Sequence, residues 1–593
     1  MATQKTQKKT TVRPVKRRGS VKRSAQHGNK GKVNPGREIE AVSPIKIYFL
    51  GGLNEIGKNI TAYEYNDEII IIDCGMAFPD SDMLGVDIVI PDFTFLEKNK
   101  EKIKGIFLTH GHEDHIGSLP YLLREINVPV YGTKLTLSLV DAKLREHGIS
   151  KKSKLVVCEA GEIVHTGCFR VEFIGVNHSI PDSVGFAIST PVGTIIQTGD
   201  FKIDSTPVYG EMIDIARFSE LGKQGVLALL MDSTNAERRG YTTSERTVGE
   251  SFEYLFSKAE NKRIIVATFA SNIQRIQQII DAAVAHGRKV AVSGRSMINV
   301  VSIAMELGYL NVPQGIIIDI SKVNSYSPEQ IVLITTGSQG EPMSALSRMA
   351  FADHRKVIVG PQDFIIISAT PIPGNEKTVS KVVNELMRLG CTVIYEKMYE
   401  VHTSGHACQE ELKLMMGITR PRFFIPVHGE MKHLTANASL ARSMGIADEN
   451  IFIPEIGSQI EIYENEIRCT GTVPAGKIMV DGYGVGDVGS IVLRDRKHLS
   501  EDGIIVVVTT MDAEDGHIIT GPDVISRGFV YVRESESLMD EARSLVLDVI
   551  ENCLDNNIRE WGAMKGRIRD DLSKFLYEKT KRSPMILPII MEI

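Results

Sequence analysis

The chain has 593 residues, of which 42% are hydrophobic, 24% charged and 6% aromatic, and its formal charge is −6. At about 150 residues per domain, this length allows three or four domains with cores that need no disulfide or metal for stability. The composition excludes a collagenous, fully disordered or small disulfide-framed protein. No apolar run approaches the roughly 20 residues needed to span a bilayer, and the first residues lack the apolar core of a secretory signal. We therefore expect a soluble, cytoplasmic protein without membrane contact.

The seven cysteines are scattered and form no C-x-x-C pair. This usage is typical of a reducing compartment and argues against a thiolate zinc ribbon.

The N-terminus is strongly basic. Residues 1–37 contain 12 Lys or Arg and no Asp or Glu, so the remainder of the chain carries a charge of −18. The segment has few large apolar side chains, and we expect residues 1–44 to be a disordered basic tail. A nucleic-acid-binding arm is the favoured function; a solvated extension and an organellar transit peptide are the alternatives.

The first ordered block is predicted to begin near Ile45 and to be rich in short strands. Apolar runs closed by turns predict strands at Ile45–Leu50, Glu68–Asp73 and Ile103–Thr109, and helical spacing follows at Leu119–Ile126. Further strands are expected at Leu155–Val157, Val171–Val176, Gly185–Ile188 and Thr194–Thr198. This succession favours a two-sheet core flanked by helices.

After Val226 the pattern changes to alternating strands and helices. Strands are predicted at Arg263–Phe269, Lys289–Ser293 and Ile331–Thr335, with helices at Ser271–His286, Met297–Leu307 and Ser344–Phe351. Such alternation indicates a parallel sheet with helical crossovers. The turn from Thr336 to Gly340 could cradle a phosphate or could simply be a tight crossover.

Short strands return beyond Gly390, including Phe423–Pro426, and the Gly-rich stretch Val473–Gly489 resembles a boundary. A final compact α+β unit is predicted from strands Gly503–Thr510 and Met585–Glu592 and helices Met539–Cys553 and Trp561–Tyr577.

The strongest chemical signal is the segment from Thr109 to Gly117, which places four candidate ligands, His110, His112, Asp114 and His115, within six residues. Imidazole and carboxylate groups are the usual ligands of zinc-class ions. Crowding these groups without a cation would be unfavourable, so we expect a metal site. One loop cannot complete two coordination shells. His178, Asp200 and His428 each follow a predicted strand and supply further ligands.

The H-x-H-x-D-H segment and the later His, Asp and His resemble the metallo-β-lactamase superfamily. This resemblance implies that His110, His112 and His178 bind one zinc ion, that Asp114, His115 and His428 bind a second, and that Asp200 bridges them. Asp73 resembles the family's first motif, a carboxylate that orients a ligand histidine.

Segments Asp232–Glu237 and His402–Ala407 resemble the first two motifs of the β-CASP branch, whose members cleave nucleic acids, and His428 stands as the third. Segments Gly51–Gly57, Gly337–Pro342, Ser526–Phe529 and Lys579–Arg582 extend the resemblance to the bacterial ribonuclease J family. The fold implied is an α/β protein: a metallo-β-lactamase αββα sandwich interrupted by an inserted β-CASP α/β domain and followed by a small α+β domain. We place the sandwich at 45–244 and 386–465, the β-CASP domain at 245–385, a linker at 466–492 and a C-terminal oligomerisation domain at 493–593.

The resemblance implies a two-zinc ribonuclease, with Mn²⁺ or Mg²⁺ as possible substitutes. Its activities would be 5′-to-3′ exonucleolysis on 5′-monophosphorylated RNA and some internal cleavage, in mRNA decay and rRNA maturation. His406, supported by Asp232, is the candidate proton donor to the leaving oxygen, the alternative being a phosphate-binding role. A terminal phosphate pocket is expected from Ser233, Thr234, His402, Thr403, Ser404, Gly405 and His406. Arg295 adds charge there or is an ordinary surface arginine.

Three other functions compete. A small-ester or thioester hydrolase uses the same metal fold, a DNA-directed β-CASP nuclease shares the inserted domain, and a non-catalytic RNA-binding subunit would not need all seven ligand positions filled. Asp481 and the acidic stretch Asp80–Asp92 are candidates for a structural calcium ion. Expected partners are single-stranded RNA, further copies of the chain as a homodimer or homotetramer, and RNA-degradation or ribosome-associated complexes.

Overall fold

The computed structural model describes residues 43–593 except 260, 342, 373–374, 514–515 and 531–535, so most of the predicted basic tail lies outside the described residues. Among the described helices, none is long and apolar enough to cross a membrane.

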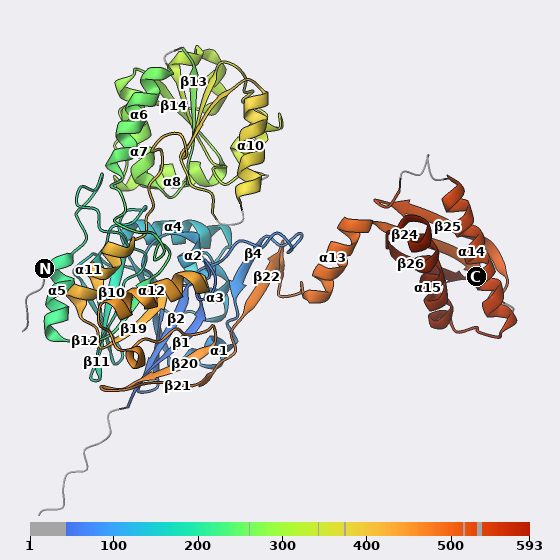
Figure 1. The fold of residues 1–593 in the computed structure, drawn as a ribbon, viewed down its shortest axis with the longest axis horizontal. Helices are drawn as coiled ribbons and strands as arrows, with labels where there is room; N and C mark the ends of the chain where they lie inside the picture. The colour runs from blue at the N-terminus through green and yellow to red at the C-terminus, as the bar shows by residue number, and fades with distance from the viewer. Residues whose placement is uncertain (1–42, 260, 342, 373–374, 514–515, 531–535) are drawn as a thin grey trace, which may run out of the picture. The chain divides into compact units, whose positions relative to one another are not determined.

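Two β-sheets form the core of the first domain (Figure 1). The first has eight strands in the order β21-β20-β1-β2-β3-β5-β6-β7, and the second has six in the order β19-β12-β11-β10-β9-β8. Apolar side chains of both sheets, such as Phe107 and Phe173, pack in one buried cluster between them. The strands of the first sheet are β1 (Ile45–Gly51), β2 (Ile60–Tyr65), β3 (Glu68–Ile72), β5 (Ile103–Phe107), β6 (Val130–Gly132), β7 (Leu155–Val157), β20 (Ser458–Ile462) and β21 (Ile467–Thr472). Those of the second are β8 (Ile163–Thr166), β9 (Phe169–Gly175), β10 (Val184–Thr190), β11 (Gly193–Gln197), β12 (Val226–Asp232) and β19 (Phe423–Val427).

Helices cover the outer face of each sheet. Leu122 and Leu135 pack against Ile71 and Ile106 of the first sheet, and Phe218 and Met415 pack against the second. The result is the predicted αββα sandwich. Its helices are α1 (Thr94–Lys98), α2 (Glu113–Ile116), α3 (Leu119–Glu125), α4 (Lys134–Glu146), α5 (Ile215–Gln224), α11 (Gln409–Thr419) and α12 (Met431–Ser443).

The inserted domain is built on a six-stranded sheet in the order β15-β14-β16-β13-β17-β18, and every pair in it is parallel. Figure 1 shows α6 and α10 on opposite sides of this sheet. Near-continuous apolar strands suit a sheet that is buried on both faces. The strands are β13 (Arg263–Ala267), β14 (Lys289–Ser293), β15 (Ile317–Ile318), β16 (Ile331–Thr335), β17 (Asp363–Ile367) and β18 (Thr392–Tyr395). The helices are α6 (Arg246–Lys258), α7 (Ile273–Ala285), α8 (Arg295–Leu307), α9 (Ala345–Ala350) and α10 (Glu376–Arg388).

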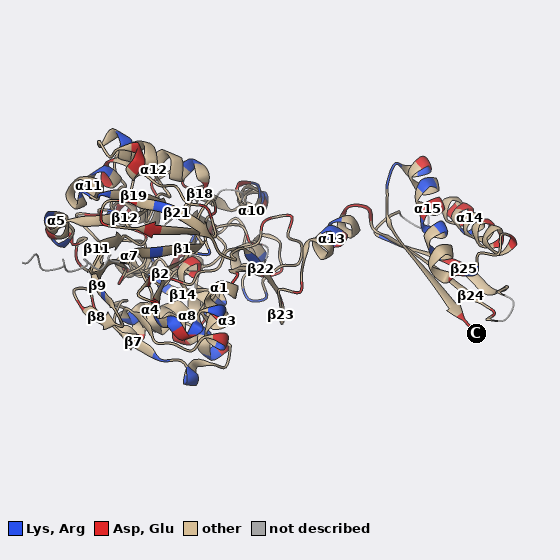
Figure 2. Ribbon diagram, turned by 90° about the horizontal axis from the view of Figure 1, so that it is seen from below, with Lys and Arg blue, Asp and Glu red and all other residues tan. Residues whose placement is uncertain are grey.

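The C-terminal domain has a three-stranded sheet, β25-β24-β26, with α14 and α15 packed on one face. Figure 2 shows acidic and basic residues along both helices. Its elements are α13 (Ser490–Asp502), β24 (Ile504–Met511), β25 (Ile518–Arg527), α14 (Glu536–Asp555), α15 (Trp561–Thr580) and β26 (Met585–Glu592).

Two boundaries differ from the sequence-based expectation. β18 pairs with β17, so the inserted sheet extends to Tyr395, beyond the expected boundary at 385. The stretch 466–492 is not a bare linker, because β21 pairs with β20 and β22 (Lys477–Asp481) pairs with β4 (Ile88–Pro91) and β23 (Gly484–Val485). Short strands with mixed composition carry too weak a periodic signal to be recognised alone.

Candidate metal centre

The candidate ligands converge from the ends of several strands. His110 follows β5, His178 follows β9, Asp200 follows β11 and His428 follows β19. These four groups and His115 are almost completely buried, whereas His112 and Asp114 are partly exposed. The ends of these strands therefore bring the candidate ligands together at one edge of the sandwich.

The seven residues form two groups that share one carboxylate. His110, His112, His178 and Asp200 make the first group, and Asp114, His115, Asp200 and His428 make the second, with ligand atoms in each group within 4.8 Å of one another. In the second group, Asp200 Oδ2 lies 3.3 Å from His115 Nε2, and Asp200 Oδ1 lies 3.2 Å from His428 Nδ1. The structure thus brings together the residues of each expected ligand group, and their binding of two ions stays a prediction.

Electrostatics separates the histidines into two classes. Burial lowers the pKa of His110 and His178 well below the usual value and that of His112 to about 4, so these imidazoles are neutral and have lone pairs to offer. Burial also acts on His115 and His428, but the surrounding aspartates raise their pKa values.

This donor set fits divalent cations. Neutral imidazoles and ionised aspartates are the ligand forms that zinc-class ions require. Burial opposes ionisation of Asp114 and Asp200, yet the adjacent histidines lower the pKa values of both carboxyls. A cation in each group would stabilise the ionised carboxylates in the same way, and His115 and His428 would then not need to be protonated.

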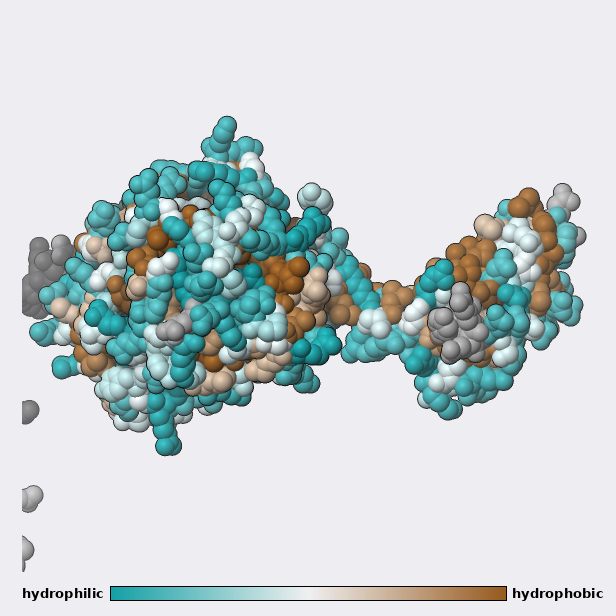
Figure 3. All heavy atoms as spheres, turned by 90° about the horizontal axis from the view of Figure 1, so that it is seen from above, coloured by the Kyte–Doolittle hydropathy of each residue, from teal (hydrophilic) through white to brown (hydrophobic). Residues whose placement is uncertain are grey.

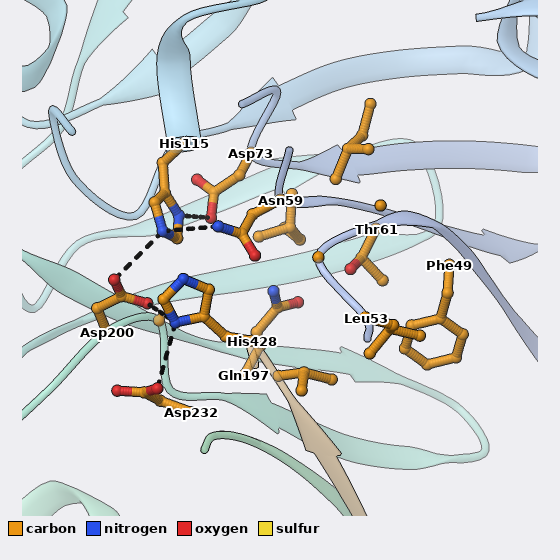
Figure 4. Close-up of a pocket in the computed structure, with 16 residues that line it drawn as sticks. Phe49, Leu53, Asn59, Thr61, Asp73, His115, Gln197, Asp200, Asp232 and His428 are labelled. Carbon is orange, nitrogen blue, oxygen red and sulfur yellow. Dashed lines mark hydrogen bonds and ion pairs between the residues drawn. The ribbon is translucent and has the colours of Figure 1, made fainter. Parts of the chain in front are cut away.

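Asp73 and Asn59 hold His115 in place (Figure 4). Asp73 Oδ2 lies 2.8 Å from His115 Nδ1, and Asp73 Oδ1 accepts a 2.8 Å hydrogen bond from the Thr109 backbone N–H. This contact directs Nε2 of the ring toward Asp200, which is the effect expected of a carboxylate that orients a ligand histidine. Asn59 Nδ2 lies 3.1 Å from His115 Nε2 and donates to the Asp114 carbonyl at 3.1 Å. Sequence reasoning missed Asn59, although it lies just beyond the glycine-rich segment Gly51–Gly57.

A third group of acidic and imidazole side chains adjoins the first two. Asp232 Oδ2 lies 2.7 Å from His406 Nδ1, and Asp232 Oδ1 lies 3.2 Å from His428 Nδ1. Burial would lower the pKa of His406, but Asp232 and Asp200 raise it, which favours the imidazolium form. His406 Nδ1 is also 4.0 Å from Asp200 Oδ2. The expected proton donor is thus held at the edge of the candidate metal cluster.

The expected phosphate-pocket residues do not all face this centre. Ser233 is fully buried, and its hydroxyl donates to the Met231 carbonyl and accepts from Asn437. Thr403 is buried against Thr243. Both hydroxyls are bonded within the protein interior, and their place in the phosphate pocket stays a prediction. Thr234, Ser404 and His406 remain partly exposed, and His402 accepts a hydrogen bond from Arg275.

Gly405 allows the close approach that orients His178. The Gly405 carbonyl lies 2.7 Å from His178 Nδ1 and accepts its proton, which leaves Nε2 for the first ligand group. A Cβ atom on residue 405 would lie 2.6 Å from His178 Cε1. Only glycine fits this position without displacing the imidazole.

We expect Gly405→Ala to lower metal affinity of the first group by about 10- to 100-fold, the range seen when ligand orientation is disturbed. Titration with zinc under competition from a chromogenic chelator measures this change. Gly417→Ala is the matched control, because its Cβ would meet only Met444 Cε at 3.6 Å. Equal affinities for the two variants would contradict the orienting role of Gly405.

Two other candidate sites stay predictions. The Asp481 carboxylate pairs with Arg496, and within the described ranges it belongs to no group of ligands dense enough for an ion. Arg295 is exposed at the start of α8.

Comparison with known proteins matches four segments of the chain. They are the metallo-β-lactamase superfamily (53–213), the ribonuclease J β-CASP domain (261–386), the Zn-dependent metallo-hydrolase RNA specificity domain (393–454) and the ribonuclease J C-terminal domain (491–593). Ribonuclease J2 of Bacillus subtilis is 45% identical over 93% of this chain and 99% of its own length. The chain belongs to the ribonuclease J family.

Ribonuclease J 1 of Streptococcus pyogenes is 44% identical over 92% of the chain and 97% of its own length. A crystal structure of a protein of unknown function from Enterococcus faecalis matches with a TM-score of 0.50 and 15% identity, covering 71% of this chain and all of that one. At this identity the likeness shows the fold alone. Family membership and the metal-binding fold make the chain a metal-dependent nuclease of the hydrolase class.

Proposed function

We propose that the protein is a zinc-dependent ribonuclease that degrades 5′-monophosphorylated RNA from the 5′ end, with some internal cleavage, in mRNA decay and rRNA maturation. The observation that carries this proposal is the pair of ligand groups sharing Asp200 beside the Asp232–His406 pair. When bound, two divalent cations would polarise the phosphoryl group and activate water for in-line hydrolysis.

The chain's own residues supply the rest of the reaction. Asp232 fixes His406 through Nδ1, so Nε2–H is free to donate a proton to the leaving 3′ oxygen. Asp73 and the Gly405 carbonyl fix the tautomers of His115 and His178. Positioned groups of this kind lower the barrier because they need no rearrangement during the reaction.

Ser404 is well placed for a terminal phosphate. Its Oγ accepts hydrogen bonds from Asn235 Nδ2 at 2.9 Å and from the His406 N–H at 3.2 Å, so its own hydrogen is left to donate. A small donor beside an imidazolium suits a monophosphate. A bulkier triphosphate would have to place its additional negative charge near the same small donor.

End-labelled RNAs that differ only in 5′-phosphorylation test the proposal. With zinc present, monophosphorylated RNA should release mononucleotides from the 5′ end faster than triphosphorylated RNA of the same sequence. Equal rates would contradict the terminal pocket. Matched DNA and a small carboxylic ester serve as controls, and faster turnover of either would favour the corresponding alternative.

Deletion of residues 1–37, which carry 12 Lys or Arg, should weaken RNA binding and flatten its dependence on salt. Each phosphate that the shortened chain no longer neutralises reduces the slope of log K against log salt by about 0.7 for single strands. Fluorescence anisotropy with a 5′-labelled RNA from low to moderate salt measures both effects. An unchanged slope would make the tail a spacer.

The C-terminal domain is proposed to pair subunits into dimers or tetramers. The face of its sheet away from the helices exposes Ile525, Leu587, Ile589 and Met591, each more than a third exposed, and Figure 3 shows hydrophobic surface on this domain. Exposed apolar patches of this kind mark interaction sites. Light scattering of the full chain and of a variant lacking residues 491–593 tests the assignment.

A further inference from the structure

The connection that carries His406 has little regular structure of its own. Between β18 and α11, residues 396–408 form no helix or strand, and this segment returns the chain from the inserted domain to the sandwich. The place of His406 therefore depends on side-chain contacts made by this return connection.

Arg275 makes the most concentrated of these contacts. It lies on α7, is completely buried, and uses all five of its N–H donors. Two bonds, of 2.8 and 2.9 Å, go to the Glu245 carboxylate, and one of 2.9 Å goes to the Ser368 carbonyl. The other two reach His402 Nδ1 at 2.8 Å and the Thr403 carbonyl at 3.3 Å, both on the return connection.

The Arg275 guanidinium also binds the outgoing connection, the segment that ends at Glu245 and leads from the sandwich into the inserted domain. Glu245 is the last residue before α6, where the chain enters the inserted domain, and its N–H donates to Asp204 Oδ2 of the sandwich at 3.1 Å. The two connections also bond directly, because Thr403 Oγ1 donates to the Thr243 carbonyl at 2.9 Å. Arg275 thus joins both crossings between the domains.

A second chain of bonds leads from this junction to the proposed proton donor. Thr242 Oγ1 and Asn235 Nδ2 donate to the His406 carbonyl at 2.7 and 2.9 Å. A displacement of the junction would therefore move the backbone of His406. Misplacement of a reacting group by about 1 Å can reduce a rate about 10²-fold.

A buried ion pair is a costly way to obtain stability alone, because desolvation offsets much of the attraction. The rigid fork of arginine does, however, fix several partners in one geometry, which the single point charge of lysine cannot reproduce.

We propose that Arg275 is a positioning residue. Through Glu245 and the return connection, it fixes the position of His406 relative to Asp232 and the ligand cluster. This inference rests on the proposed function for its catalytic consequence, while the placement itself can be measured without turnover.

Arg275→Lys is the test variant, and Arg263→Lys is its matched control. Arg263 is also a buried arginine of the inserted domain, but its side chain donates to Asp363, at 2.7 and 3.1 Å, and to the Ile358 carbonyl rather than to the return connection. We expect R275K to lower the single-turnover rate on monophosphorylated RNA about 10²-fold with zinc content unchanged. R263K should remain near the wild-type rate. Glu245→Gln provides a milder second variant should R275K fail to fold.

Combination with His406→Ala distinguishes positioning from general destabilisation. Adding R275K to H406A should lower the single-turnover rate little further, because the group that Arg275 positions is already absent. If the two substitutions acted independently, their effects on the rate would multiply. Hydrogen–deuterium exchange of residues 400–408 in the full chain should be faster in R275K than in R263K. Unchanged exchange there, or fully multiplicative rates, would overturn the inference. A wild-type chain that failed to cut RNA would defeat the proposed function, and the exchange data would still decide the role of Arg275.

Discussion

Asp200→Ala is expected to reduce RNA hydrolysis about 10³-fold or more and to deplete both metal sites. Asp200 is the residue common to the two ligand groups, so its loss removes one carboxylate oxygen from each. Cation stabilisation of a developing phosphoryl charge contributes several kcal/mol, and each 1.36 kcal/mol corresponds to tenfold in rate.

Elemental analysis of the purified variants gives the sharpest comparison. His112 belongs to the first group alone, so His112→Ala should retain about one ion per chain, whereas D200A should retain fewer. Asp214→Ala is the control, because Asp214 caps α5 through the Arg217 N–H and lies outside all three ligand groups. Full metal content and turnover in D200A, or activity of the wild type after exhaustive chelation, would contradict the two-ion centre.

The candidate ligand cluster could be predicted from sequence because four of its members lie close together in the chain. His110, His112, Asp114 and His115 lie in one loop, and a charge-dense loop after a strand has few explanations other than a cation. Asp200 and His428 were recognisable because they too stand at strand ends. At His428 the backbone adopts a left-handed conformation (φ 55°), an unfavourable geometry for a non-glycine residue that tends to persist at functional sites.

Residues that support the site from distant parts of the chain were harder to predict, with the exception of Asp73. Asn437 lies on α12 and donates to the Asp232 carbonyl and to Ser233 Oγ, 205 and 204 positions away. No local pattern marks such an amide. The burial of Ser233 was hard to foresee for the same reason, since its motif position gives its neighbours in sequence but not the direction of its side chain.

The end of the inserted domain was hard to predict from sequence for a related reason. β18 has only four residues, Thr392–Tyr395, and its membership in the parallel sheet depends on pairing with β17 rather than on its own periodicity. Edge strands of this length are recognised from their partners.

His406→Ala is expected to slow RNA cleavage about 10²- to 10⁴-fold, the usual contribution of a positioned general acid. The metal content should be unchanged, because His406 stands beside the two ligand groups assigned to the ions rather than within them. His406→Ala is more informative than a change at Asp232, whose carboxylate also contacts His428.

The leaving group reveals whether His406 donates a proton. The 3′ oxygen of RNA needs a proton as it departs, whereas p-nitrophenolate does not at neutral pH. H406A should therefore lose far less activity on a p-nitrophenyl phosphodiester than on RNA. His433, buried outside the three ligand groups, supplies the control variant His433→Ala. Equal losses on both substrates would instead assign His406 to phosphate binding.

The pH profile gives an independent check with a defined sign. Asp232 raises the pKa of His406 against the effect of burial, so the donating imidazolium predominates below that raised pKa. The wild-type single-turnover rate should fall as pH rises through it, and H406A should lack this alkaline fall. A proton donor acts only below its own pKa, so a fall of the same size in H406A would have to arise from another group. That result would show that His406 is not the general acid.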